Sequence, residues 1–339
     1  MSIEIKTTPM QYNLSLIKAV KPSMRYDGSK PFDVWQKEAR AKLAELLGMS
    51  SFTKCDPKFE IDFVKEEETY TEYRFVIQSE EGYFLPAHLW IPKGKEGKIP
   101  VFICLQGHSK GFHISLGKPK YEGDENTIAG GDRDFAPQIV REGFCALAIE
   151  QRNFGECGGT EKGPACHVSS MSAIINGRTT IGERAWDTSR VIDAVLENFD
   201  VVDENSIYCM GNSGGGTATY YTACLDERIS LAMPSCAVCT YKDSIAAMHH
   251  CVCNFVPNIV KYFDMGDLAG LIAPRKLIVV HGVNDGIFPD HGVKETFEII
   301  KEMYKAAGVP DDCRLVSGPE GHRFYADLSW PVVHELIGK

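Results

Sequence analysis

The sequence lacks any apolar run long enough to cross a membrane, since no segment approaches the roughly 18 to 20 apolar residues that a spanning helix requires. Its first residues, MSIEIK, are polar and charged, whereas a signal peptide contains an apolar stretch of about 7 to 15 residues. It also lacks a basic patch, and a net charge of -10 disfavours binding to a phosphate backbone or an anionic membrane. We therefore expect neither nucleic acid nor a membrane as a partner.

Twelve cysteines accompany this lack of a secretory signal. That combination is typical of a reducing compartment, where thiols act as small buried hydrophobes and do not form a disulfide framework. We therefore expect a cytoplasmic protein. The sequence leaves the oligomeric state open, a homo-oligomer included.

The 339 residues are enough to bury a sizeable core, and their pattern changes twice along the chain. Residues 1–59 form a predicted helical N-terminal extension, because apolar residues recur every three or four positions over 32–47 and Gly48 is a plausible C-cap. From residue 60 to 92 apolar and polar residues alternate, which predicts antiparallel strands. Residues 60–339 as a whole form the predicted catalytic domain.

Short, nearly continuous apolar runs follow, as expected for strands that are covered on both faces. They span 101–105, 144–149, 207–210, 229–233 and 276–280, with predicted helices over 134–141, 181–198, 215–225 and 293–304. This alternation predicts an α/β fold with a doubly wound, mostly parallel sheet and helices on both faces. Two irregular stretches, 107–133 and 237–267, are long enough to be loop insertions that form a lid.

The sequence Gly211-Asn212-Ser213-Gly214-Gly215 matches the G-x-S-x-G nucleophile elbow and lies between a predicted strand and a predicted helix. A serine hydroxyl needs a base, and the base needs an acid to orient it. Asp285 and His322 follow Ser213 in that order, each in a glycine-containing loop after a predicted strand. We predict these three as the catalytic triad; the alternatives are that Asp285 caps a turn and that His322 is a surface histidine.

An oxyanion formed at Ser213 would need two preorganised donors. We expect the backbone amide of Gly214, the residue after the nucleophile, to be one of them. The other should come from the loop Gln106-Gly107-His108, and we assign it to the backbone amide of His108. The imidazole of His108 either faces substrate or serves packing.

With these motifs the sequence resembles the α/β-hydrolase superfamily, in particular its dienelactone hydrolase and acetyl xylan esterase-like branch, over about residues 60–339. The resemblance implies a serine esterase that cleaves carboxylic esters, often acetyl groups on xylan or related sugars, without a metal or other cofactor. Gln106 stands where a histidine is more usual in the oxyanion motif, which leaves the backbone donor unchanged. The lack of a secretion signal favours oligosaccharides or small esters over polymeric substrate.

Three further side chains are candidates for substrate binding: Arg152, which follows a predicted strand, and His249 and His250 in the second irregular stretch. A structural ion pair is the favoured interpretation of Arg152. We read Arg184 and Asp187, three residues apart on a predicted helix, as a local ion pair.

A group of cysteines and histidines has a composition that zinc sites share; it comprises Cys236, Cys239, His249, His250, Cys251 and Cys253. Its C-x-C spacing is atypical of zinc hairpins. We therefore favour buried thiols in a substrate-covering loop, with no metal, and keep zinc as the alternative.

The sequence as a whole predicts a serine carboxylic ester hydrolase, an acetyl esterase acting on acetylated sugars, xylo-oligosaccharides or small esters. Two alternatives stay open: a serine peptidase of the prolyl-oligopeptidase type, which uses the same constellation, and a non-catalytic ligand-binding protein on the hydrolase fold.

Overall fold

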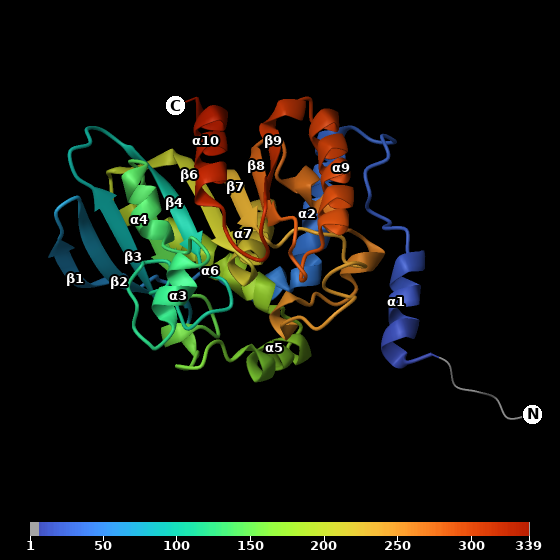
Figure 1. The fold of residues 1–339 in the computed structure, drawn as a ribbon, viewed down its shortest axis with the longest axis horizontal. Coiled ribbons are helices and arrows are strands. Elements are labelled where there is room, and N and C mark those ends of the chain that lie inside the picture. Colours follow the sequence, from blue (N-terminus) through green and yellow to red (C-terminus); the bar gives the residue numbers. More distant parts are fainter. Residues whose placement is uncertain (1–6, 339) are drawn as a thin grey trace, which may run out of the picture.

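Nine strands form one sheet in the order β1-β2-β3-β5-β4-β6-β7-β8-β9 (Figure 1). The computed structural model describes residues 7–338. Strands β1 to β3 and the β3–β5 pair are antiparallel, and every pair from β5 to β9 is parallel, as the change of pattern after residue 92 predicts. The strands are β1 (Glu60–Glu66), β2 (Tyr70–Glu80), β3 (Tyr83–Pro92), β4 (Ile99–Leu105), β5 (Cys145–Ile149), β6 (Val202–Asn212), β7 (Ile229–Ser235), β8 (Lys276–Gly282) and β9 (Cys313–Gly318).

Helices connect the parallel strands and include the four that the sequence predicts between them. The helices are α1 (Pro9–Ala19), α2 (Phe32–Leu47), α3 (Asp124–Ala129), α4 (Phe135–Arg141), α5 (Cys166–Ile175), α6 (Thr180–Asn198), α7 (Gly214–Leu225), α8 (Met265–Leu268), α9 (Asp290–Ala306) and α10 (Ala326–Ile337). Three short helices were not predicted: α3 lies inside the irregular stretch 107–133, α5 precedes α6, and α8 begins inside the irregular stretch 237–267.

The parallel part of the sheet is buried on both faces, and β4 shows how the sequence achieves this. Val101, Ile103 and Leu105 contribute to a core shared with α2, α6, α7 and α9. Phe102 and Cys104 point to the other face, into a second core with α4 and α10. Because strand side chains alternate between faces, a continuous apolar run is required wherever both faces carry helices.

The N-terminal helices differ in how they join this body. Helix α2 buries Trp35, Leu43 and Leu47 in the same core as the sheet, and it ends at Gly48, whose φ of +77° is the left-handed C-cap conformation that the sequence predicts. A side chain at Gly48 would also meet the carbonyl oxygen of Gly177 at 2.2 Å. Helix α1 has no buried residue and lies at the edge of the molecule (Figure 1).

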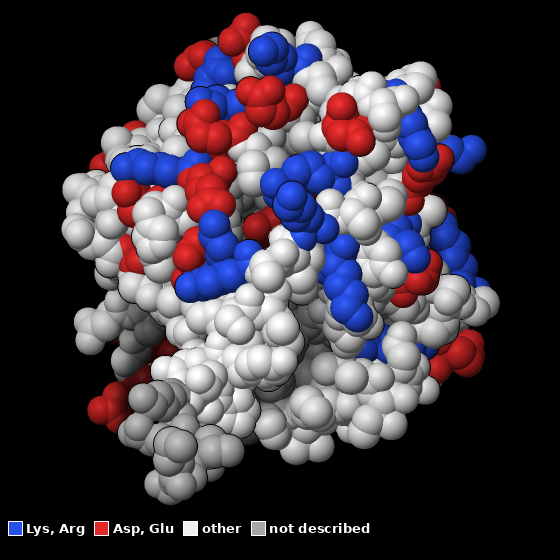
Figure 2. Space-filling view, turned by 90° about the vertical axis from the view of Figure 1, so that its right-hand side faces the viewer, with Lys and Arg blue, Asp and Glu red and all other residues white. Residues whose placement is uncertain are grey.

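The surface that includes this edge carries charges of both signs. Figure 2 shows Lys and Arg interspersed with Asp and Glu over the upper part of this face, and a largely uncharged lower part. None of the helices within residues 7–338 has the length and apolar character that a membrane crossing demands.

Candidate active site

The nucleophile candidate Ser213 occupies a sharp turn between β6 and α7. Its φ of +55° and ψ of -122° lie in a region that a non-glycine residue rarely adopts. The turn needs glycine on both sides: a Cβ at Gly211 would lie 2.5 Å from the backbone of Gly215, and one at Gly215 would lie 2.0 Å from the carbonyl oxygen of Leu105. The G-x-S-x-G spacing is therefore a steric requirement of this backbone.

The acid and base candidates form a hydrogen-bonded pair. Asp285 Oδ2 lies 2.8 Å from His322 Nδ1, while Asp285 Oδ1 accepts hydrogen bonds from the backbone amides of Ile287 (2.8 Å) and Phe288 (3.1 Å). Burial alone would raise the pKa of Asp285, but the bond to His322 and these amides outweigh it and lower the pKa below its usual 3.8. A buried carboxylate thus holds the ring through Nδ1 and leaves Nε2 available for proton transfer.

Ser213 and His322 line the same pocket, of about 290 Å³. The remaining lining residues are Gly107, His108, Arg133, Asn212, His249, His250, Cys251, Asn254, Ile287 and Phe288. Among the described residues Asp285 is the hydrogen-bond partner of His322, and no bond joins His322 to Ser213. Catalytic hydrogen bonds are often long before substrate binds, so the geometry is compatible with a general base.

The loop after β4 lies against the nucleophile. A Cβ at Gly107 would meet Ser213 Cβ at 3.2 Å, so the backbone of this loop passes directly beside the serine. The imidazole of His108 packs on Gly214, since a Cβ there would lie 2.6 Å from its Cε1 atom. The two residues predicted to supply oxyanion amides are therefore neighbours, and the His108 ring contacts Gly214 while it also lines the pocket.

A buried carboxylate, Glu150, holds this loop from behind. Its Oε1 accepts from Gln106 Nε2 at 2.7 Å and from the Phe112 amide at 3.1 Å, and its Oε2 accepts from the Glu156 amide at 3.3 Å. Burial raises the pKa of Glu150 to about 8, although these hydrogen bonds oppose the shift. Glu150 and Gln106 lie 44 residues apart, so no local sequence pattern reveals this link.

Arg152 lies in a network of acids outside the pocket. It donates to Asp187 from Nε (2.7 Å) and Nη2 (2.8 Å) and to Glu80 at 2.6 Å, and it stacks on Tyr83 at 4.0 Å from the ring centre. A guanidinium engaged this fully is a structural ion pair, which agrees with the favoured interpretation of the sequence.

The predicted pair between Arg184 and Asp187 is wrong. Asp187 is taken by Arg152 and by the hydroxyl of Ser79 (2.7 Å). Arg184 instead donates to the carbonyl oxygen of Arg152 at 2.9 Å and approaches Cys253 and Cys166. A separation of three residues on a helix permits an ion pair, but the carboxylate of Asp187 is bound by Arg152, which comes from another segment.

Both histidine candidates line the pocket. His250 Nε2 lies 3.1 Å from the hydroxyl of Ser244, and its ring meets Phe288 edge-on. Burial, reinforced by the nearby charge of His322, lowers the pKa of His250. The His250 imidazole, with its pKa lowered, therefore forms part of the pocket wall beside Phe288.

Sequence reasoning missed Arg133, which lines the pocket with Ser213 and His322. Its Nε is buried without a hydrogen-bond partner, and none of the ion pairs within residues 7–338 includes it. Burial lowers the pKa of its guanidinium. An arginine that lines the pocket and pairs with no carboxylate among the described residues is suited to a negatively charged or carbonyl group of a ligand. Its position in an irregular stretch gave no sequence signal.

The predicted cysteine and histidine cluster divides into separate groups. Cys236 donates to the carbonyl oxygen of Arg323 at 3.2 Å and lies beside Asp285, and Cys239 packs near Gly292. Cys251 and Cys253 meet a different pair of residues, Cys166 at the start of α5 and His108. The members of this second group come from three segments that lie far apart in the sequence.

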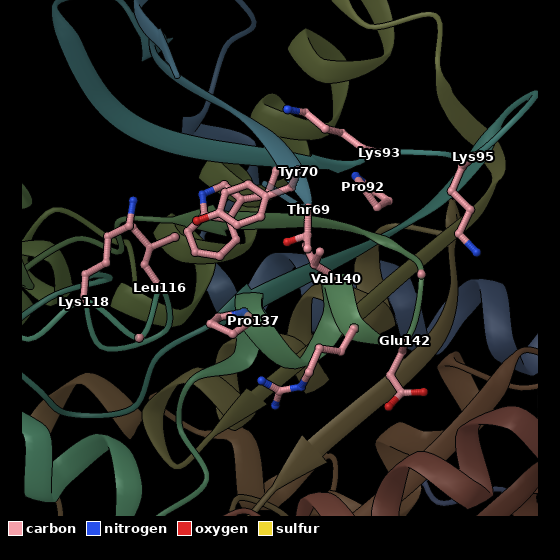
Figure 3. Close-up of a pocket in the computed structure, with 14 residues that line it drawn as sticks. Thr69, Tyr70, Pro92, Lys93, Lys95, Leu116, Lys118, Pro137, Val140 and Glu142 are labelled. Atoms are coloured by element: carbon pink, nitrogen blue, oxygen red, sulfur yellow. The ribbon is translucent and has the colours of Figure 1, made fainter. Parts of the chain in front are cut away.

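A larger cavity, of about 720 Å³, lies near the amino end of β5 (Figure 3). Tyr70 and Trp90 stack there at 4.1 Å, and Lys118 lies over the Trp90 ring. Its lining contains no serine, cysteine or histidine. The smaller pocket is therefore the candidate active site.

No family model matches the chain. Among curated proteins, "Putative hydrolase YtaP" of Bacillus subtilis is 28% identical over 244 residues, which cover 70% of this chain and 77% of that protein. Among solved structures, a "putative acetyl xylan esterase" from Bacteroides fragilis gives a TM-score of 0.81 at 16% identity, covering 98% of this chain and 96% of that one.

A glucuronoyl esterase from Solibacter usitatus gives a TM-score of 0.69 at 16% identity, covering 94% of this chain and 97% of its own. Acetyl Xylan Esterase 1 from Thermoanaerobacterium sp. gives 0.59 at 19% identity, with 95% and 98% covered. These likenesses establish the α/β-hydrolase fold, so the predicted fold is confirmed, and acetyl xylan esterases are among its structural neighbours.

Proposed function

We propose that this protein is a serine carboxylic ester hydrolase that works through an acyl-enzyme. The observation that carries the proposal is one pocket lined by a serine on a strained elbow and by a histidine that a buried aspartate orients. Ordinary surface serines and histidines have no need of a backbone strained in this way. The esterase neighbours with the same fold support this choice of chemistry.

In the proposed reaction Ser213 Oγ attacks the ester carbonyl carbon while His322 Nε2 takes the hydroxyl proton. The carbonyl oxygen becomes an oxyanion, to which the amides of His108 and Gly214 donate hydrogen bonds. The intermediate collapses, the bond to the alcohol breaks, and His322 returns the proton to the leaving oxygen. Water, deprotonated by His322, then attacks the acyl-enzyme, releasing the carboxylic acid and restoring Ser213.

The pocket volume bears on the substrate. About 290 Å³ is at the lower end of the range for small-molecule sites, roughly 300 to 1,000 Å³. Such a pocket favours a short acyl group, so we propose acetyl esters of sugars or xylo-oligosaccharides, or other small esters. We further propose a cytoplasmic location, which the twelve free thiols support.

The test is hydrolysis of p-nitrophenyl acetate together with covalent labelling by a fluorophosphonate. Ser213→Ala is expected to lower kcat by about six orders of magnitude, the usual cost of removing such a nucleophile, and to abolish labelling. Ser230→Ala, a hydroxyl on β7 bonded to the carbonyl oxygen of Ile207, is the matched control and should keep both. Labelling of Ser213→Ala at another residue would refute the assignment.

A panel of acyl chain lengths, acetylated xylo-oligosaccharides and peptide amides separates the alternatives. Preference for short acyl esters supports the proposal. Faster cleavage of amides would favour the peptidase, and binding without turnover would favour a ligand-binding protein.

A further inference from the structure

Three thiols and one imidazole meet beside the candidate active site, outside the triad. Cys166 is the first residue of α5, Cys251 and Cys253 belong to the loop 249–254, and His108 follows β4. The three sulfurs and a ring nitrogen of His108 all lie within 4.8 Å of one another, and His108 Nε2 is 3.1 Å from Cys253 Sγ. We refer to these four residues as the Cys3His cluster.

The donor set matches that of a structural zinc site. Zinc in such sites has four ligands in a tetrahedron, and Cys3His is one of the usual combinations. Zn–S bonds of about 2.3 Å place tetrahedral sulfurs about 3.8 Å apart. The cluster therefore has to contract by no more than about 1 Å along its longest edge, which side-chain rotation supplies. We propose that the Cys3His cluster binds one zinc ion.

The charge around the cluster supports this proposal independently. Arg184 is 3% exposed, and its contacts are the carbonyl oxygen of Arg152, the sulfurs of Cys253 (3.6 Å) and Cys166 (3.7 Å), and the Phe154 ring. No carboxylate pairs with it among the ion pairs of residues 7–338. A buried guanidinium requires a negative partner. Zn²⁺ with three thiolates and a neutral imidazole has a net charge of -1, which Arg184 neutralises.

The packing of α5 gives a further reason for a metal. The buried residues of this helix are Cys166, Ser170 and Ala173, whereas its larger apolar side chains are half-buried (Ile174) or exposed (Val168, Met171 and Ile175). The small core beneath it consists of Phe154, Cys166 and Cys253, with Cys251 and Val252 at its margin. Because so little apolar surface is buried here, hydrophobic packing holds α5 and the two loops together only weakly. A metal ion with ligands from all three segments would fix them relative to one another.

The site also has a consequence for catalysis, which rests on the proposed function. His108 would be a zinc ligand through its side chain and an oxyanion donor through its backbone amide. Its ring packs on Gly214, which supplies the other amide. The zinc would act as a positioning group, because a closed four-ligand site leaves no position for substrate. Loss of the zinc would loosen residues 106–108, which we call the oxyanion loop, and would lower kcat more than it changes KM.

The decisive measurement is the metal content of the full-length protein, purified without added metal and without chelator, by mass spectrometry of the elements. One zinc ion per chain is expected. Replacement of zinc by Co²⁺ should produce thiolate-to-cobalt charge-transfer absorption and the intense visible bands of tetrahedral cobalt. This readout is independent of enzymatic activity, so the zinc site stands or falls separately from the esterase.

Two variants locate the ion. Cys253→Ser should lose the zinc and the cobalt bands, whereas Cys55→Ser, which removes a half-buried thiol bonded to the carbonyl oxygen of Gln78, should retain both. If Cys253→Ser does not fold, the zinc content and cobalt spectrum of the native protein still decide. A native protein with no zinc and no cobalt bands would overturn the proposal. If the native protein contains no zinc and a reducing agent increases its number of free thiols, the cysteines form a disulfide instead. That result would also overturn the proposal.

Removal of zinc by a chelator tests the positioning role. We expect kcat for p-nitrophenyl acetate to fall about tenfold or more, the usual cost of disturbing a positioning contact, with KM changed less, and zinc to restore it. An unchanged kcat in zinc-free protein would refute the role in catalysis while leaving the site itself intact.

Discussion

Replacing Glu150 by glutamine tests whether a buried carboxyl group behind the oxyanion loop makes the fold sensitive to pH. In the native protein Glu150 is 1% exposed and its pKa is raised by burial to about 8, against 4.5 for an ordinary glutamate. In the variant, an amide oxygen at the place of Glu150 Oε2 accepts from the Phe112 and Glu156 amides, as Oε2 does in the native structure at 3.3 Å each. The amide nitrogen then takes the place of Oε1 and donates to Gln106 Oε1 once the Gln106 amide group turns over. Glu150→Gln should therefore fold.

The direction in which stability changes with pH follows from the number of protons that the folded and unfolded states bind. Between pH 4.5 and 8 the folded state keeps the Glu150 proton that the unfolded state has lost, so the free energy of unfolding decreases as pH rises. The contribution is fully present below pH 4.5 and is lost as pH rises through about 8. Between pH 5 and pH 7 the native protein should lose roughly 2 to 3 kcal/mol relative to Glu150→Gln, from RT ln[(1 + 10^(pH − 8))/(1 + 10^(pH − 4.5))] at the two values.

The assay is urea-induced unfolding of both proteins at pH 5, 6 and 7. Subtracting one curve of stability against pH from the other removes the contributions of all groups that the two proteins share. Glu161→Gln, which removes an exposed carboxylate from the following loop, is the control and should run parallel to the native protein. A constant difference between the native protein and Glu150→Gln over this range would refute the argument, because it would mean that Glu150 is ionised when buried.

Two further predictions concern the pocket. Asp285→Asn should lower kcat for p-nitrophenyl acetate by about 10⁴-fold with KM little changed, because the amide holds His322 in the wrong tautomer; a loss below tenfold would direct the search to another acid. Arg133→Gln should raise KM about 10- to 100-fold for esters that carry a carboxylate, the worth of one charge-assisted hydrogen bond, and leave p-nitrophenyl acetate nearly unaffected; equal effects on both substrates would exclude charge recognition.

Local sequence patterns predicted the features that depend on local geometry. The continuous apolar run of β4 is required by a sheet covered on both faces, and the glycines around Ser213 are required by contacts of 2.0 to 2.5 Å with backbone atoms. These constraints act over a few residues, so they are visible in the chain. The order Ser213, Asp285, His322 predicts the triad for a related reason, since each residue follows a parallel strand and the carboxyl ends of such strands share one edge.

Contacts between distant segments were not predictable in this way. Cys236 and Cys239 are close in sequence to Cys251 and Cys253, but the partners of the latter come from α5 and from the loop after β4. Arg184 and Asp187 have the spacing of a helical ion pair, yet Asp187 binds Arg152 from another loop through two charge-assisted hydrogen bonds. In both cases residues that are close in sequence bind partners from distant segments instead of one another. No local sequence pattern reveals those partners.

The oxyanion loop is where these distant contacts converge. Gln106 is held by Glu150, the backbone of Gly107 lies against Ser213, and the ring of His108 is both packed on Gly214 and part of the Cys3His cluster. A donor amide contributes to catalysis only if it is fixed before the oxyanion forms. The carboxyl group of Glu150 anchors Gln106 and the Cys3His cluster anchors His108, two residues further on, so both anchors act on the position of the His108 amide. Ionisation of Glu150 and removal of the proposed zinc should consequently lower kcat non-additively, because either change alone frees the segment that the other would release.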